Sequence, residues 1–108
     1  MITARAFRSG DLLVGFEISG HSGSAESGED IICAAVSSCA YMTVNTLTDI
    51  LHLDSSIRID EGYMKFLIPT TANAAAQTVM KGLYIHLEQL GSQYPDNVKL
   101  ENTEVKQC

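Results

Sequence analysis

Cys33 and His21 are the two residues whose types and positions could carry out covalent chemistry together. His21 follows a segment typical of a strand, and Cys33 lies near the start of a segment typical of a helix, so the loop between them can bring imidazole to thiol. The thiolate is the reactive form, and a thiol with a reference pKa of about 8.5 is mostly protonated at neutral pH. An imidazole within hydrogen-bond reach can accept that proton and later protonate a leaving group. We therefore predict that Cys33 is a nucleophile and His21 its general base.

Asp30 lies three residues before Cys33, and three roles are open to it. It could cap the helix by accepting the amide of Cys33. It could instead be the fourth residue of a capping box begun by Ser27, which would place Cys33 deeper in the helix. Its carboxylate could also orient His21, as the third group of a nucleophile, base and acid arrangement does. Capping is our first expectation and orientation of His21 our second.

The other cysteines and histidines are expected to have no catalytic role. Free cysteine is among the most buried residue types, which favours a core position for Cys39 and is also the alternative interpretation of Cys33. A zinc site made of His21, Cys33 and Cys39 would lack the close paired spacing of such sites, so we expect neither a metal nor a cofactor. His52 and His86 are expected on the surface.

Hydrophobic periodicity predicts five strands and two helices. The apolar stripe of the first helix predicts a buried side formed by Ile32, Val36, Ala40, Val44, Leu47, Ile50 and Leu51. For the second helix it predicts a buried side of Ala76, Val79, Met80, Leu83, Leu87 and Leu90, with Gln77, Lys81 and Glu88 in solvent. The expected elements are strands 2–8 and 12–18, a helix 31–52, strands 57–60 and 63–68, a helix from the N-cap Asn73 to a stop at Gly91, and a strand 98–105.

This order, β-β-α-β-β-α-β, indicates an α+β fold in which two helices pack on one face of a mainly antiparallel sheet, a two-layer sandwich. Met64, Phe66 and Ile68 are expected to face the core. With 108 residues, the chain is expected to form a single domain spanning residues 1–108. Between the second strand and the first helix, residues 20–30 are rich in glycine and serine. A connection this long favours function or mobility.

Composition restricts the partners. The net charge of −6 and the pI of about 4.8 disfavour nucleic-acid binding and favour a basic protein partner. No secretory signal pattern opens the sequence, so we expect a cytoplasmic protein. Residues 31–51 are long enough to span a bilayer, but the polar residues among them, such as Ser37 and Asp49, favour a core helix, and no membrane association is expected. Three cysteines, an odd number, make a disulfide framework unexpected.

Two short motifs carry a family resemblance. The pair Gly20-His21, a glycine-containing loop, and the run Gly-Glu-Asp-Ile-Ile-Cys-Ala-Ala-Val-Ser at residues 28–37 resemble the bacterial ribosomal-processing cysteine protease family, Prp. The resemblance extends over the whole chain in length and in element order. It implies that His21 and Cys33 form a catalytic dyad, with Asp30 and Ser37 in supporting roles.

The resemblance also implies a substrate. The family removes a short amino-terminal extension from a large-subunit ribosomal protein precursor, a basic protein, and cuts after an aromatic pair, which requires an apolar pocket beside the dyad. It further implies a homodimer and a mobile loop, including Gly20, Ser22, Gly23 and Gly28, that closes on the peptide. The alternative hypothesis is a non-catalytic docking module whose acidic surface binds a basic ribosomal protein.

Overall fold

The elements of the computed structural model follow the predicted order, with one π-helical turn added after the first helix. The structure describes residues 1–20, 27–69 and 73–105. The elements are β1 (Ile2–Ser9), β2 (Leu12–Ser19), α1 (Ser27–Asn45), the π-helical turn η1 (Thr46–Ile50), β3 (Ser56–Asp60), β4 (Tyr63–Leu67), α2 (Ala74–Gln93) and β5 (Val98–Glu104).

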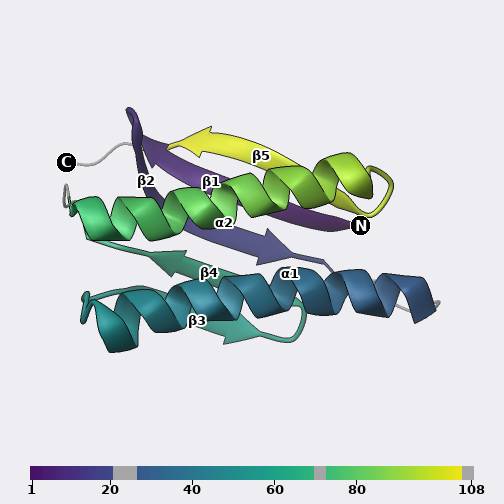
Figure 1. The fold of residues 1–108 in the computed structure, drawn as a ribbon, viewed down its shortest axis with the longest axis horizontal. Helices are drawn as coiled ribbons and strands as arrows, with labels where there is room; N and C mark the ends of the chain where they lie inside the picture. Colours follow the sequence, from purple (N-terminus) through teal and green to yellow (C-terminus); the bar gives the residue numbers. More distant parts are fainter. Residues whose placement is uncertain (21–26, 70–72, 106–108) are drawn as a thin grey trace.

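The five strands form one sheet in the order β3-β4-β2-β1-β5. Neighbouring strands run antiparallel except β1 and β5, which are parallel because α2 carries the chain back across the sheet before β5 begins. Both helices lie on the same face of the sheet (Figure 1). The predicted α+β class, with a mainly antiparallel sheet and two helices on one face, is therefore confirmed.

The core lies between the helices and the sheet face that they cover. Phe16 from β2 and Phe66 from β4 are paired across the strands with ring centroids 5.8 Å apart. Met64, Phe66 and Ile68 are buried, as predicted from their alternation. The largest fully buried side chains come from β2, β4, both helices and η1, and they are Phe16, Phe66, Leu13, Leu47, Met80, Leu87 and Val36.

The first helix begins earlier than its apolar period indicates. The prediction of residues 20–30 as loop is wrong for the last four of them, because α1 starts at Ser27. Those residues are a serine, a glycine and two acids, so they add nothing to the apolar pattern, although acidic residues are favourable in a first turn. Gly28 and Asp30 therefore belong to the first helical turn.

The end of the first helix also departs from the prediction. Ile50, expected on the buried stripe, is 69% exposed, and Leu51 is only partly buried. The reason is η1, where hydrogen bonds span five residues instead of four and rotate the following side chains away from a 3.6-residue period. By length and composition residues 31–50 could cross a membrane, but here Val36, Ala40 and Leu47 of this segment pack against the sheet.

The second helix confirms its N-cap and corrects two other predictions. The side chain of Asn73 accepts a hydrogen bond from the amide of Ala76. Gln77, predicted in solvent, is buried, and its side chain bonds both backbone groups of Leu13 at 2.8 and 2.9 Å. These bonds satisfy backbone groups at the sheet, which a helical projection cannot reveal. The helix also continues past the predicted stop at Gly91 to Gln93.

Candidate active site

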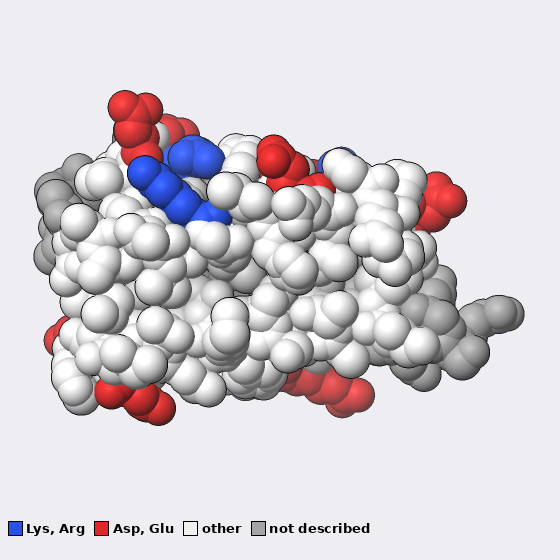
Figure 2. Space-filling model, viewed as in Figure 1, with Lys and Arg blue, Asp and Glu red and all other residues white. Residues whose placement is uncertain are grey.

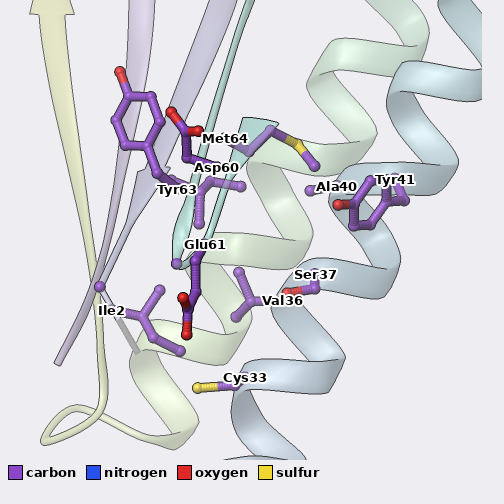
Figure 3. A pocket seen from close by; sticks show the side chains of 13 residues that line it. Ile2, Cys33, Val36, Ser37, Ala40, Tyr41, Asp60, Glu61, Tyr63 and Met64 are labelled. Carbon is purple, nitrogen blue, oxygen red and sulfur yellow. The ribbon is translucent and has the colours of Figure 1, made fainter. Parts of the chain in front are cut away.

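A pocket of about 300 Å³ separates α1 from the turn between β3 and β4 (Figure 3). Its wall combines apolar side chains of the sheet, one side of α1 and the polar residues of the turn. The lining residues are Ile2, Ile18, Gly20, Cys33, Val36, Ser37, Ala40, Tyr41, Asp60, Glu61, Gly62, Tyr63 and Met64. The pocket therefore collects residues from the beginning, middle and second half of the chain.

Cys33 lies in this pocket and is partly buried against the core. Figure 3 shows its side chain pointing from α1 toward the sheet, on the same side of the helix as Ser37. The spacing of Cys33, Ser37 and Tyr41, four residues each, places all three along one side of α1. A thiol and a hydroxyl therefore border the same space.

Gly20 forms the part of the pocket wall from which the chain leaves β2. It has a φ of +93°, its amide donates to the carbonyl of Gly62 at 3.0 Å, and a Cβ at this position would collide with the carbonyl oxygen of Met1. Glycine is the residue that tolerates both the positive φ and the close approach. The backbone immediately before His21 is thus held at the pocket that contains Cys33.

Several of the predicted site residues lie outside what the structure describes. His21, Ser22 and Gly23 fall in the gap at 21–26, and for Asp30 only the backbone is described. Because α1 begins at Ser27, the prediction that Asp30 caps the helix is wrong. Cys33 lies deeper in the helix than that prediction required. This depth agrees with the alternative in which the helix starts near Ser27.

The deeper position of Cys33 removes one source of an oxyanion site. Cys33 lies six residues after Ser27, and an amide at that depth is bonded within the helix. Its hydrogen is therefore not available to an oxyanion. The donor has to come from another group, and the dipole effect of the helix start has also weakened at this depth.

Acidic and aromatic residues of the β3–β4 turn form the opposite wall, and the sequence alone did not identify them. Asp60 and Glu61 are exposed, and Asp60 pairs with Arg58 at 3.2 Å. Tyr63 donates its hydroxyl proton to Glu17 at 2.7 Å, and this hydrogen bond raises the pKa of the Tyr63 phenol. Helical spacing could have identified Tyr41, but only the strand order brings the β3–β4 turn to Cys33.

Cys39 lies on the other side of α1. It was predicted in the core, and it packs against the core while remaining only partly buried. Its thiol donates to the carbonyl of Val36 at 3.1 Å, and burial raises the pKa of Cys39. Cys33 and Cys39 are not joined by a disulfide.

His52 and His86 are exposed, as predicted. Within residues 1–20, 27–69 and 73–105, no three acidic, histidine or cysteine side chains gather as a metal site.

The sequence model of the family described as "Cysteine protease Prp" matches residues 1–99. The chain belongs to the Prp family. Among its relatives, the ribosomal processing cysteine protease Prp of Bacillus subtilis (strain 168) is 32% identical over 107 residues, which cover 93% of this chain and 96% of the relative. The Prp protein of Staphylococcus aureus (strain Mu50 / ATCC 700699) is 26% identical over 83 residues, or 75% of this chain and 78% of the relative.

Solved structures share the fold. The crystal structure of SMU.848 from Streptococcus mutans has a TM-score of 0.89 and 31% identity, covering 97% of this chain and 96% of that one. A Prp protease from S. aureus, solved in complex with a substrate peptide, has a TM-score of 0.86 and 23% identity, covering 95% and 100%. The architecture described above is therefore that of Prp proteins, and the family is one of cysteine proteases.

Proposed function

We propose that this protein is a cysteine endopeptidase that removes the short amino-terminal extension of a large-subunit ribosomal protein precursor. The observation that carries the proposal is the pocket shared by Cys33 and Gly20, the residue before His21, in a chain of the Prp family. The chain leaves β2 at this pocket and returns to it in α1. Gly20, directly before His21 in the chain, therefore lies beside the space that the thiol borders.

In the proposed reaction His21 takes the proton of the Cys33 thiol, and the sulfur attacks the scissile carbonyl. The tetrahedral intermediate collapses when His21 returns the proton to the leaving amine, which frees the downstream product and leaves a thioester on Cys33. His21 then takes a proton from water, whose oxygen attacks the thioester. Collapse of this second intermediate releases the carboxylate product, and the proton on His21 returns to the Cys33 sulfur. The cycle needs no metal or cofactor.

Two residues have supporting roles in this proposal. Asp30, in the first turn of α1, orients the imidazole of His21. Of the three roles considered for Asp30, this is the one that involves the dyad. Ser37 follows Cys33 by one turn and borders the pocket, so its hydroxyl can donate a hydrogen bond to the peptide. The loop that contains Ser22 and Gly23 is proposed to close over the bound substrate.

The pocket suits the proposed substrate. Its walls include Ile2, Ile18 and Met64, which provide apolar surface for an aromatic side chain at the cleavage site. Asp60 and Glu61 provide negative charge on the rim, which suits a basic precursor. Since such precursors are used in ribosome assembly, the reaction is proposed to take place in the cytoplasm.

The test is incubation of the purified protein with a peptide that spans the extension junction of a ribosomal protein, followed by mass spectrometry. We expect one cut after the aromatic pair with the wild type and none with Cys33→Ala or His21→Ala. Matched controls are Cys39→Ala and His52→Asn, where asparagine tolerates the positive φ of 53° at this position. Both controls should cleave the same bond.

Three results would contradict the proposal. Turnover by Cys33→Ala would exclude this thiol as the nucleophile. Turnover by His21→Ala near the wild-type rate would exclude His21 as the base. Tight binding of the peptide by the wild type with no product would favour the acidic docking module instead.

A further inference from the structure

The two acids of the β3–β4 turn differ in what balances their charge. Asp60 forms an ion pair with Arg58 at 3.2 Å. These two residues alternate with Ile59 along β3 and so project from the same face of the sheet, where the Arg58 guanidinium also lies 5.6 Å from the ring centroid of Tyr63. The charge of Asp60 is therefore offset by a cation of its own strand.

Glu61 has no such cation in the part of the chain that the structure describes. None of the ion pairs within residues 1–20, 27–69 and 73–105 includes it. Figure 3 shows its side chain directed from the turn into the pocket, toward the end that Cys33 borders, while Asp60 points away from that end. Among the described residues that line the pocket, none is Lys, Arg or His. Glu61 thus gives these walls a negative charge that they do not balance.

The turn fixes the backbone that carries Glu61. Asp60 and Tyr63 are paired across the strands, so Glu61 and Gly62 alone connect β3 to β4. Gly62 has a φ of +66°, and its carbonyl accepts the Gly20 amide at 3.0 Å, which ties the turn to the end of β2. A carboxylate on a backbone held in this way loses less conformational freedom when it binds a ligand.

The charge of the surrounding surface has the same sign. On the helix side of the molecule, Figure 2 shows Asp and Glu along the lower margin, at α1 and β3, whereas the visible Lys and Arg lie toward the upper margin. The net charge of the whole chain is −6. A surface of one sign around a cleft raises the local concentration of ligands of the opposite sign, so a cationic group is drawn toward the pocket.

We infer that Glu61 binds a lysine or arginine side chain of the substrate and makes that residue part of the cleavage specificity. The inference rests on the proposed function, because it places a peptide in the pocket beside Cys33. From Cys33 to Tyr41, α1 rises about 12 Å along the pocket, the length of roughly three to four residues of extended peptide. The bound cation therefore belongs to a residue within about four positions of the cut bond.

Both parts of such a side chain find matching surface in the pocket. The ammonium or guanidinium group can donate charge-assisted hydrogen bonds to the Glu61 carboxylate. The aliphatic stem can lie on the apolar wall formed by Ile18 and Met64. An Asp or Glu at the same peptide position would meet a like charge instead. Glu61 is therefore a specificity residue that selects a cation and disfavours an anion.

The first test measures peptide binding without cleavage, by fluorescence anisotropy of labelled extension peptides on the Cys33→Ala variant. A single lysine is moved through the four positions after the cut bond and the two positions before the aromatic pair, and norleucine replaces it in the matched peptides. At one position or more, the lysine peptide should bind about three- to tenfold more tightly than its norleucine partner. Adding Glu61→Gln should reduce this preference to less than about twofold.

The second test reverses the charge. Glu61→Lys, also on Cys33→Ala, should bind a peptide with glutamate at the selected position about threefold or more tightly than the lysine peptide. The matched control is Glu88→Gln on α2, because Glu88 is an exposed acid that lines a different cavity. It changes the net charge by the same amount as Glu61→Gln and should keep the lysine preference. The control thus separates a contact with Glu61 from an effect of net charge.

Equal affinity for lysine and norleucine at every position would overturn the inference, and so would failure of every peptide to bind. A preference that Glu61→Gln left intact, or that Asp60→Asn alone removed, would also overturn it. Cleavage of the same peptides by the wild type is measured in parallel. A lysine preference that depends on Glu61, without cleavage, would uphold the inference and contradict the peptidase. Cleavage of both peptides at equal rates, with equal binding, would contradict the inference alone.

Discussion

The two sides of α1 carry one cysteine each and differ in almost everything around it. On one side, Cys33 borders a pocket whose far wall is the acidic β3–β4 turn. On the other side, Cys39 borders an apolar groove toward α2, and its thiol is bonded to the carbonyl of Val36. The two thiols are six positions apart along the same helix. Their surroundings differ because of position relative to the sheet and the neighbouring helix, and not because of residue type. One side holds the proposed nucleophile, and the other holds a thiol that packs against the core.

The strongest test of this comparison is removal of each thiol. Cys33→Ala should lower peptide cleavage by about a thousandfold or more, because no other group replaces the nucleophile. Cys39→Ala should keep cleavage within a few-fold of the wild type and lower the free energy of unfolding by about 1 kcal/mol, through a small cavity beside the core. Rates come from a fluorogenic extension peptide and stabilities from urea unfolding. Equal loss of cleavage in both variants would remove the distinction between the two sides.

The importance of the backbone where the chain leaves β2, beside Cys33, can be tested by substituting two glycines that have positive φ. Gly20→Ala should reduce cleavage by about a hundredfold, because relief of the clash with Met1 displaces the backbone that precedes His21. Its free energy of unfolding should fall by about 2–4 kcal/mol. Gly10→Ala, at the other end of the β1–β2 hairpin, has φ +61° and open space, so it should cost about 1 kcal/mol and leave cleavage unchanged.

Alkylation should distinguish the two thiols directly. With iodoacetamide at neutral pH, Cys33 should react at least about tenfold faster than Cys39, because the raised pKa of Cys39 lowers its thiolate fraction and its sulfur is engaged with Val36. Peptide mapping by mass spectrometry follows each site separately. Faster reaction at Cys39 would contradict the packing role assigned to its side of the helix.

The smallest expected effect concerns Tyr63 in the pocket wall. Its phenol donates to Glu17, which raises the Tyr63 pKa, so the folded state holds this proton more tightly than the unfolded state. The resulting stability is fully present below the unfolded phenol pKa of about 10 and is lost as pH rises through the folded value. Tyr63→Phe should therefore lower Tm by no more than a few degrees at pH 7, and the difference should shrink above pH 10. A difference that grows with pH would contradict this account.

Much of the fold follows from local patterns. Alternation identified the strands, as Met64, Phe66 and Ile68 illustrate, because a strand with one covered face must bury every second residue. The cap at Asn73 was predictable because it depends on one side chain and an amide three residues on. The same patterns missed the start of α1, whose first turn is polar, and the exposure of Ile50, which follows a change of helical pitch.

The candidate site likewise has a part that the sequence predicted and a part that it did not. The types and spacing of His21 and Cys33 were enough to predict a thiol nucleophile with an imidazole base, and the motif around them was enough to indicate the Prp family, whose model matches residues 1–99. The neighbours of Cys33 across the pocket were not predictable. Asp60 and Glu61 reach it because β4 pairs with β2 and places the β3–β4 turn beside α1.

By itself, the sequence predicted a reactive thiol and imidazole, and it determined most of the helices and strands and most of their apolar sides, because each of these depends on neighbours within about one turn or one strand. The tertiary structure alone decided that Gln77 is buried against Leu13, that Gly20 lies against Met1, and that Cys33 and Cys39 face different environments. These contacts join residues that are distant in the chain, and the order of strands in the sheet fixes which of them meet.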